Sequence, residues 1–285
     1  MYKRTELSIA VPASLVSDIP HLREKTTRIG MVGRAAAIFR VDEVIIFPDD
    51  PAINQSRDLN LTSTILSYME TPQYLRKYLF KVKPELRYAG ILPPLRTLHH
   101  PVTKNLRELK VGEFREGVTV SRVEEGVLVD IGVEHPFLVK DRDIKLNKRI
   151  TIRTTAIGTK LEAKMINRNE VPSYWGFKVS ALDMPLGQLV KQRGFDLVIA
   201  TSRMGTPFAK VKDEVLTRWK NARKVMLAFG APARGLYEIV KLENVVLDQI
   251  ANFVVNMVPS QGAETVRTEE AVYASLAILN IATMG

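Results

Sequence analysis

Cysteine is absent from this chain of 285 residues. Its absence excludes disulfide bonds, thiol catalysis and zinc sites built on cysteine ligands. Histidine is scarce, and His99, His100 and His135 have no evident metal-ligand partners in the sequence. No metal site is therefore expected.

Long hydrophobic runs are absent too. No apolar run approaches the length of about 18 residues that a membrane-spanning helix requires. The first twenty residues do not resemble a secretory signal, because Pro12, Ser14 and Asp18 interrupt the apolar residues. We therefore expect no membrane association and a cytoplasmic location.

Acidic residues are fewer than basic ones. The 31 Asp and Glu residues stand against 41 Lys and Arg residues, which gives a net charge of +10. The basic excess is spread along the chain, and no segment forms a basic tail. This balance is compatible with a polyanionic partner such as RNA, bound on a surface that folding would assemble. The alternative is a basic surface without a nucleic-acid partner.

The C-terminal third carries the first functional signal. Two apolar runs of strand length, Val225–Phe229 and Phe253–Val258, each lead into a loop of small residues and prolines. After the second loop, Thr268 is expected to cap a helix. Neighbouring parallel strands that open into such loops form a crevice for a small ligand. The alternative is that the glycines of these loops serve only the turns.

One nucleotide site can be excluded from the same residues. Gly230 and Gly235 have the glycine spacing of a phosphate-binding P-loop. Leu236 and Tyr237 follow where that loop requires Lys and Ser or Thr. A nucleoside triphosphatase is therefore not expected.

Longer strings carry a family resemblance. AFGAPARGL, at 228–236, and VVNMVPSQGAETVRTEEAV, at 254–272, resemble the two C-terminal motifs of the SPOUT class of RNA methyltransferases. The similarity extends to the strings at 71–80 and 86–101, and it is closest to the archaeal and eukaryotic branch of that class. It implies an α/β fold whose SPOUT-like parallel sheet carries a C-terminal trefoil knot.

The resemblance also implies a function. The expected reaction is methyl transfer from S-adenosylmethionine to a nucleotide of structured RNA, ribosomal RNA before transfer RNA. The alternative is a non-catalytic RNA-binding or ribosome-assembly protein with a vestigial donor site. The expected donor site draws on the two loops and on a third loop at 201–205, and its residues are Thr201, Arg203, Ala228, Gly230, Gly235, Asn256, Met257, Pro259, Gly262 and Thr265.

A further motif concerns the acceptor. The segment from Arg28 to Val44 resembles the first motif of the ribose-methylating branch, in which Gly follows Asn by two residues and Arg follows by four more. Gly30 and Arg34 match, whereas Arg28 replaces the Asn. The resemblance implies Arg34 as a catalytic residue beside the acceptor, because guanidinium can contact phosphate and polarise the attacking group. Arg28 is expected to bind RNA. The alternative for Arg34 is a solvated helix residue.

The order of elements predicts one α/β domain with an insertion. A strand at Leu7–Val11, a helix at about 20–39 and a strand at Val44–Phe47 form a parallel βαβ unit. From His99 the strands become short and β-branched, as in a small all-β barrel, and resemble the start of an OB/S1-like fold. The expected domains are 1–98 and 182–285 for the α/β part and 99–181 for the barrel.

The expected barrel is rich in cations. Five of them are predicted to bind RNA, in company with the aromatic residues near position 175: Lys140, Lys145, Lys148, Arg149 and Arg153. The alternative is a solvated charged face above core aromatics.

The last helix favours self-association. Its apolar residues between Thr268 and Ala282 spread beyond one narrow stripe, which predicts two burial partners. The family resemblance implies a homodimer whose subunits share the acceptor site, with Arg34 of one subunit near the donor crevice of the other, and two burial partners for the last helix are compatible with it. The alternative is a helix buried entirely within one subunit.

Overall fold

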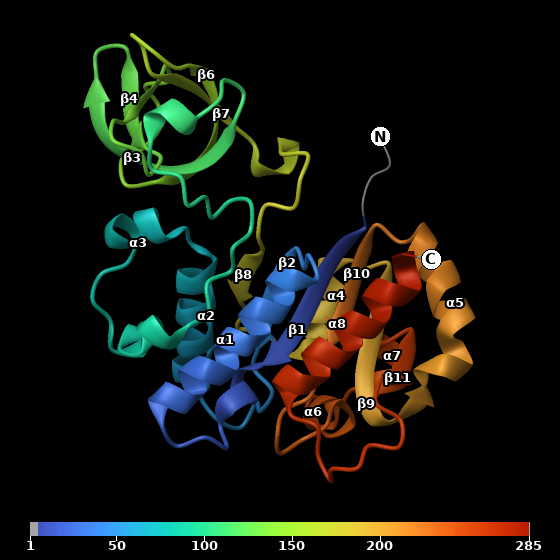
Figure 1. Ribbon diagram of the computed structural model, residues 1–285. Helices are drawn as coiled ribbons and strands as arrows, with labels where there is room; N and C mark the ends of the chain where they lie inside the picture. Colours follow the sequence, from blue (N-terminus) through green and yellow to red (C-terminus); the bar gives the residue numbers. More distant parts are fainter. Residues whose placement is uncertain (1–4, 285) are drawn as a thin grey trace. The chain divides into compact units, whose positions relative to one another are not determined.

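The computed structural model describes residues 5–284 of the chain (Figure 1). Contacts between Cα atoms divide the chain into two compact units. The first, here the sheet unit, comprises Met1–Ser67, Glu85–Pro93 and Phe177–Gly285. The second, here the barrel unit, comprises Tyr68–Pro84 and Pro94–Gly176.

A six-stranded sheet forms the centre of the sheet unit, and all of its strand pairs are parallel. Its order is β11-β9-β10-β1-β2-β8. The strands are β1 (Glu6–Pro12), β2 (Glu43–Phe47), β8 (Lys178–Ala181), β9 (Leu197–Pro207), β10 (Lys224–Ala228) and β11 (Phe253–Asn256). Every residue of β2 is buried, as expected for a parallel strand covered on both faces.

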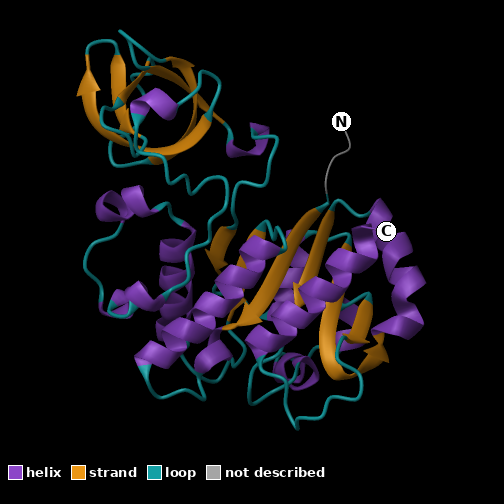
Figure 2. Cartoon of the chain, viewed as in Figure 1, coloured by secondary structure: helices purple, strands orange, loops and turns teal. Residues whose placement is uncertain are grey.

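Helices cover both faces of this sheet (Figure 2). On one face, α1 (Leu22–Ile38) and α8 (Thr268–Met284) lie side by side. On the other face, α4 (Leu186–Arg193), α6 (Leu236–Leu242) and α7 (Leu247–Ile250) pack on alternate strand residues such as Ala10 and Met226. The remaining helices of the sheet unit are α5 (Phe208–Asn221) and most of α2 (Ser56–Glu70). The predicted βαβ unit and the parallel α/β sheet are confirmed.

The barrel unit contains a closed barrel of five strands in the order β3-β4-β5-β7-β6. They are β3 (Phe114–Val123), β4 (Gly126–Asp130), β5 (Phe137–Val139), β6 (Arg149–Ala156) and β7 (Glu162–Ile166). Inward residues fill the interior, among them Val127, Val129, Phe137 and Ile152. The expected all-β barrel is thus present. The strand β7 was not predicted, because Ile166 is the one β-branched residue in its string EAKMI.

The boundaries of the units differ from the predicted ones. Tyr68–Pro84, which includes α3 (Gln73–Leu79), belongs to the barrel unit rather than to the α/β part, and the barrel segment runs from Pro94 to Gly176 rather than from 99 to 181. The physical reason lies in polar contacts. The Tyr74 hydroxyl donates to the backbone oxygen of Glu116 at 2.8 Å, which fastens α3 to β3.

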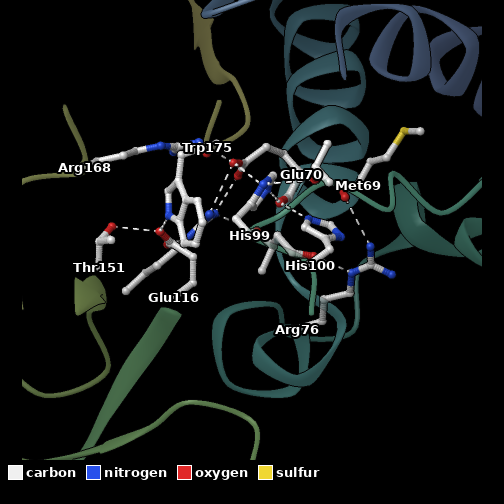
Figure 3. Close-up of polar contacts among 12 residues, drawn as sticks. Met69, Glu70, Arg76, His99, His100, Glu116, Thr151, Arg168 and Trp175 are labelled. Atoms are coloured by element: carbon white, nitrogen blue, oxygen red, sulfur yellow. Dashed lines mark hydrogen bonds and ion pairs between the residues drawn. The ribbon is translucent and has the colours of Figure 1, made fainter. Parts of the chain in front are cut away.

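A buried carboxylate, Glu70, holds the same unit together (Figure 3). Arg149 Nη1 donates to its Oε2 at 2.6 Å, and Arg168 Nη2 donates to its Oε1 at 2.7 Å. His99 Nε2 lies 3.3 Å from the same Oε1. Burial raises the pKa of Glu70, but the charges of Arg149 and Arg168 and the hydrogen bond with His99 keep it far below its usual value. Glu70 therefore joins the end of α2, the segment entering the barrel, β6 and the segment leaving the barrel.

Two local predictions need correction. Thr201–Gly205 was expected as a loop, but β9 continues through these residues to Pro207. Thr268 was expected as an N-cap, but it is the first residue of α8, and its hydroxyl donates to Gly230 O at 2.8 Å. Instead, Arg267 N donates to the Glu270 carboxylate at 2.9 Å. This is one of the two bonds of a capping box, the one in which the side chain of the third helical residue accepts from the backbone N–H of the capping residue.

Candidate functional site

A pocket of about 790 Å³ lies at the carboxyl ends of three neighbouring strands, β9, β10 and β11. Residues from the β9 extension, from the loop Gly230–Gly235 and from the 256–268 segment line it. Residues of α8 line it as well. In an open parallel sheet, ligands bind outside the carboxyl ends of the strands, so this position is the one expected for a binding site.

The β9 wall results from a break in strand pairing. Ala200 pairs with Val254, but the next residue of β11, Val255, pairs with Thr206. The residues between Ala200 and Thr206 are therefore extruded toward the pocket. Gly205 allows the two strands to close again after this excursion, because a Cβ atom there would lie 2.7 Å from the backbone nitrogen of Val255.

Side-chain hydrogen bonds fix the extruded residues to the loop after β11. Asn256 Nδ2 donates to Arg203 O at 3.0 Å. Arg203 Nη1 in turn donates to Glu264 O at 2.8 Å, and Gln261 Nε2 donates to the same oxygen at 3.0 Å. These bonds connect two of the pocket walls.

The loop Gly230–Gly235 is also held at its far end. Arg234 Nη1 contacts Asp50 Oδ2 at 2.6 Å, and this hydrogen bond lowers the pKa of Asp50. Gly235 N donates to the Glu238 carboxylate at 3.0 Å at the start of α6. A Cβ atom on Gly235 would meet nothing within 4 Å, so the glycine leaves space free beside the pocket.

The wall contributed by α8 differs from the pocket mouth. Thr268, Ala271 and Ser275 follow one another at helical spacing, and Thr268 and Ser275 are buried. Arg203, Arg234 and Glu264, by contrast, are exposed. The pocket therefore has a charged mouth and an inner wall of small residues. A ligand with a charged end and a flat, weakly polar end fits this arrangement.

Arg28 and Arg34, both on α1, do not line this pocket in the described part of the chain. Arg28 Nη1 contacts Glu269 Oε1 at 2.6 Å, and the Glu269 side chain is only 2% exposed. Arg34 lies near Tyr273 of α8. Burial raises the pKa of the Tyr273 hydroxyl, and the positive charge of Arg34 acts against that increase.

The predicted RNA-binding cations of the barrel have different environments. Arg149 is not a free surface cation, because it contacts Glu70 and also Glu116 Oε2 at 2.5 Å. Its contact with phosphate stays a prediction, and these ion pairs argue against it. Lys140 pairs with Glu162 at 2.9 Å while staying exposed. The other three, here called the barrel cations, are exposed, and no ion pair to them is found within residues 5–284: Lys145, Lys148 and Arg153.

The chain matches a known family over residues 6–279, under the description "Putative RNA methyltransferase". The chain belongs to this RNA methyltransferase family. Human 28S rRNA (uridine-N(3))-methyltransferase is 30% identical over 299 residues, covering 96% of this chain and 77% of the human protein. The mouse protein of the same name is 32% identical over 304 residues, covering 96% and 75%.

A relative from Haloarcula marismortui, an uncharacterized protein, is 34% identical over 287 residues, covering 96% of this chain and 98% of its own. Membership of the RNA methyltransferase family confirms the expected enzyme class. In keeping with that class, S-adenosylmethionine is the methyl donor.

The pocket of this RNA methyltransferase contains most of the predicted donor residues. Those on its walls are Thr201, Arg203, Gly230, Gly235, Asn256, Met257 and Thr265. Three others lie outside it. Ala228 is buried at the end of β10, where its oxygen accepts from the Thr201 hydroxyl at 3.0 Å, and Pro259 and Gly262 are exposed in the loop after β11.

The sequence analysis missed the α8 wall. Thr268 was predicted only as a cap and Ser275 had no predicted role, because the apolar residues dominate the pattern of that helix. The spacing of the small residues Thr268, Ala271 and Ser275, which places them on one helix face, was the signal available.

Proposed function

We propose that this protein methylates N3 of a uridine in large-subunit ribosomal RNA, with S-adenosylmethionine as donor. The observation that carries the proposal is the pocket at the carboxyl ends of β9, β10 and β11, which the two motif loops build together. The names of the human and mouse relatives support the choice of RNA and of atom. The proposed acceptor is therefore a base nitrogen. It replaces the ribose acceptor that the resemblance of the segment around Arg34 to the ribose-methylating branch would imply.

The pocket residues fit the donor by their chemistry. The exposed charges of Arg203, Arg234 and Glu264 suit the amino-acid end of the donor, which carries both an ammonium and a carboxylate. The small inner residues Gly230 and Ala271 leave room for the flat nucleoside end. When bound, the donor supplies an electrophilic methyl group on its sulfonium.

The protein contributes to this transfer by positioning the reacting groups and by shielding them from water. The extruded β9 residues and the hydrogen-bonded loop after β11 form two walls of the pocket and would shield a bound donor in part from water. N3 of uracil carries a proton in the free base. As N3 bonds to the methyl carbon and the methyl–sulfur bond breaks, this proton would pass to solvent, and the bonding electrons would stay on the sulfur of the departing S-adenosylhomocysteine. Catalysis therefore consists mainly of holding N3 in line with the methyl–sulfur bond.

Arg34 enters this scheme from a second subunit. We place the dimer contact on the outer side of α1 and α8, where Ile38 is 47% exposed and Ile281 is 77% exposed. Exposed large apolar residues of this kind favour burial against a second copy. In such a dimer, Arg34 of one subunit contacts the acceptor nucleotide held at the partner's pocket.

The C-terminal segment and the barrel complete the proposal. After β11 at the sheet edge, the chain crosses back past Gly230 and packs α8 on α1, a return that supports a trefoil knot. A bulky folded tag on the C-terminus is then expected to slow refolding more than the same tag on the N-terminus. The barrel is proposed to act as an OB-like module that binds RNA through the barrel cations.

Methylation at N3 has a direct readout, because N3 lies on the Watson–Crick edge and its methyl group blocks pairing. Ribosomal RNA from cells lacking this protein is expected to lose one reverse-transcription stop, and the purified enzyme with donor should restore it. A ribose methyl in digested product RNA would contradict the proposed atom. Absence of donor binding in calorimetry would instead favour the non-catalytic RNA-binding protein.

A further inference from the structure

Two buried hydroxyls have no hydrogen-bond partner among the described residues: Thr62 Oγ1 on α2 and Ser275 Oγ on α8. Buried polar atoms are almost always satisfied, and an unsatisfied one destabilises the folded protein. An exception therefore calls for a physical reason. Of the two residues, Ser275 lines the pocket and Thr62 does not.

Ser275 is 0% exposed and belongs to the inner wall of the pocket. A helical serine commonly satisfies its hydroxyl on the carbonyl four residues earlier, but no such bond forms here. The neighbouring hydroxyl on the same wall is occupied, since Thr268 donates to Gly230 O. Thr201, on the opposite wall, likewise donates to Ala228 O. Ser275 is thus the buried hydroxyl of this pocket, within residues 5–284, that has no hydrogen-bond partner.

We propose that Ser275 is a donor-binding residue whose hydroxyl hydrogen-bonds the nucleoside half of S-adenosylmethionine. The inference rests on the proposed function for the identity of the ligand. The difference between the charged mouth of the pocket and its inner wall of small residues indicates which half of the donor lies near Ser275. The zwitterionic end of the donor is expected at the exposed charges of the mouth, because burying charges without partners is costly. The nucleoside then lies against the inner wall, where Ser275 and Ala271 are.

The hydroxyl can reach such a ligand by a small change. Rotation about the Cα–Cβ bond of serine moves Oγ among three staggered positions without disturbing the helix. Its hydroxyl is both donor and acceptor, so it can satisfy either a ring nitrogen or a ribose hydroxyl. The free protein would therefore hold an unsatisfied group that becomes satisfied only when the donor binds.

The test compares Ser275→Ala with Thr62→Val, which removes the other unsatisfied hydroxyl away from the pocket. Calorimetry measures the affinities for S-adenosylmethionine and for adenosine, and urea unfolding measures the stability of the free protein. We expect Ser275→Ala to weaken both affinities by about five- to tenfold, the effect of one hydrogen bond. Thr62→Val should leave both affinities unchanged. Neither variant should lower the stability of the free protein.

Each other outcome is informative. Wild-type protein that binds no S-adenosylmethionine would refute the proposed function and the inference with it. Wild-type binding together with undiminished affinity in Ser275→Ala would refute only the inference. A loss for S-adenosylmethionine but not for adenosine would refute the assignment to the nucleoside. Ser275→Cys, which keeps the size but hydrogen-bonds weakly, should reproduce the loss if the alanine variant folds poorly.

Discussion

His100 should make the barrel unit lose stability in mild acid. Its Nε2 lies 2.6 Å from the backbone oxygen of Glu70. Burial lowers the pKa of His100 to about 4, and the adjacent His99 adds to the decrease. The unfolded chain has the ordinary value of about 6.5. Between these two values the unfolded state binds the extra proton, so the free energy of unfolding falls as the pH falls.

The size of the effect follows from the two pKa values. A difference of about 2.5 units corresponds to about 3 kcal/mol in total. Roughly 2 kcal/mol of this is expected between pH 7 and pH 5. The titration of Glu70 does not account for the loss of stability between pH 7 and pH 5. Its depressed pKa stabilises the fold above the unfolded value of about 4.5, and this contribution is lost only as the pH falls below that value.

The assay uses the chain's two tryptophans, Trp175 in the barrel unit and Trp219 in the sheet unit. In a Trp219→Phe background, urea unfolding followed by fluorescence reports on the barrel unit alone. The stability measured this way should fall between pH 7 and pH 5, and His100→Gln should remove most of the fall. A slope that persists unchanged in His100→Gln would refute the assignment to this histidine.

Three further predictions concern the donor, the RNA and the dimer. Gly235→Val should fold but lose S-adenosylmethionine binding. The control variant Gly262→Val, whose Cβ also meets nothing within 4 Å, should bind normally because position 262 lies outside the pocket. Equal affinities of the two variants in calorimetry would contradict this. Alanine at all three barrel cations should reduce the slope of log affinity for RNA against log salt by about two units, while Arg149→Met should instead lower stability. An unchanged slope would mean a solvated face. Co-expression of an Arg34→Ala chain with a Gly235→Val chain should restore part of the methylation that each lacks alone, and no recovery would count against a shared site.

The apolar pattern of the sequence predicted the frame of the sheet because β2 and its neighbours are buried on both faces. It also located the pocket loops, since Gly230 and Gly235 mark where a strand ends. The apolar pattern could not locate the unit boundary at Tyr68, because that boundary depends on the ion pairs that Glu70 forms with Arg149 and Arg168. Nor could it separate Lys148 from Arg149: these neighbours differ in environment because β6 places Arg149 beside the buried carboxylates of Glu70 and Glu116.

The ion pair between Arg28 and Glu269 has a consequence for the history of the family. Glu269 is almost fully buried, so losing Arg28 alone would leave an unpaired charge, at a cost of about 3–5 kcal/mol. Replacing both residues by uncharged ones of similar volume would cost little or nothing. The two positions, 241 residues apart in the chain, should therefore be inherited as a unit. A family member with the motif's Asn in place of Arg28 is expected to lack the carboxylate at the position of Glu269.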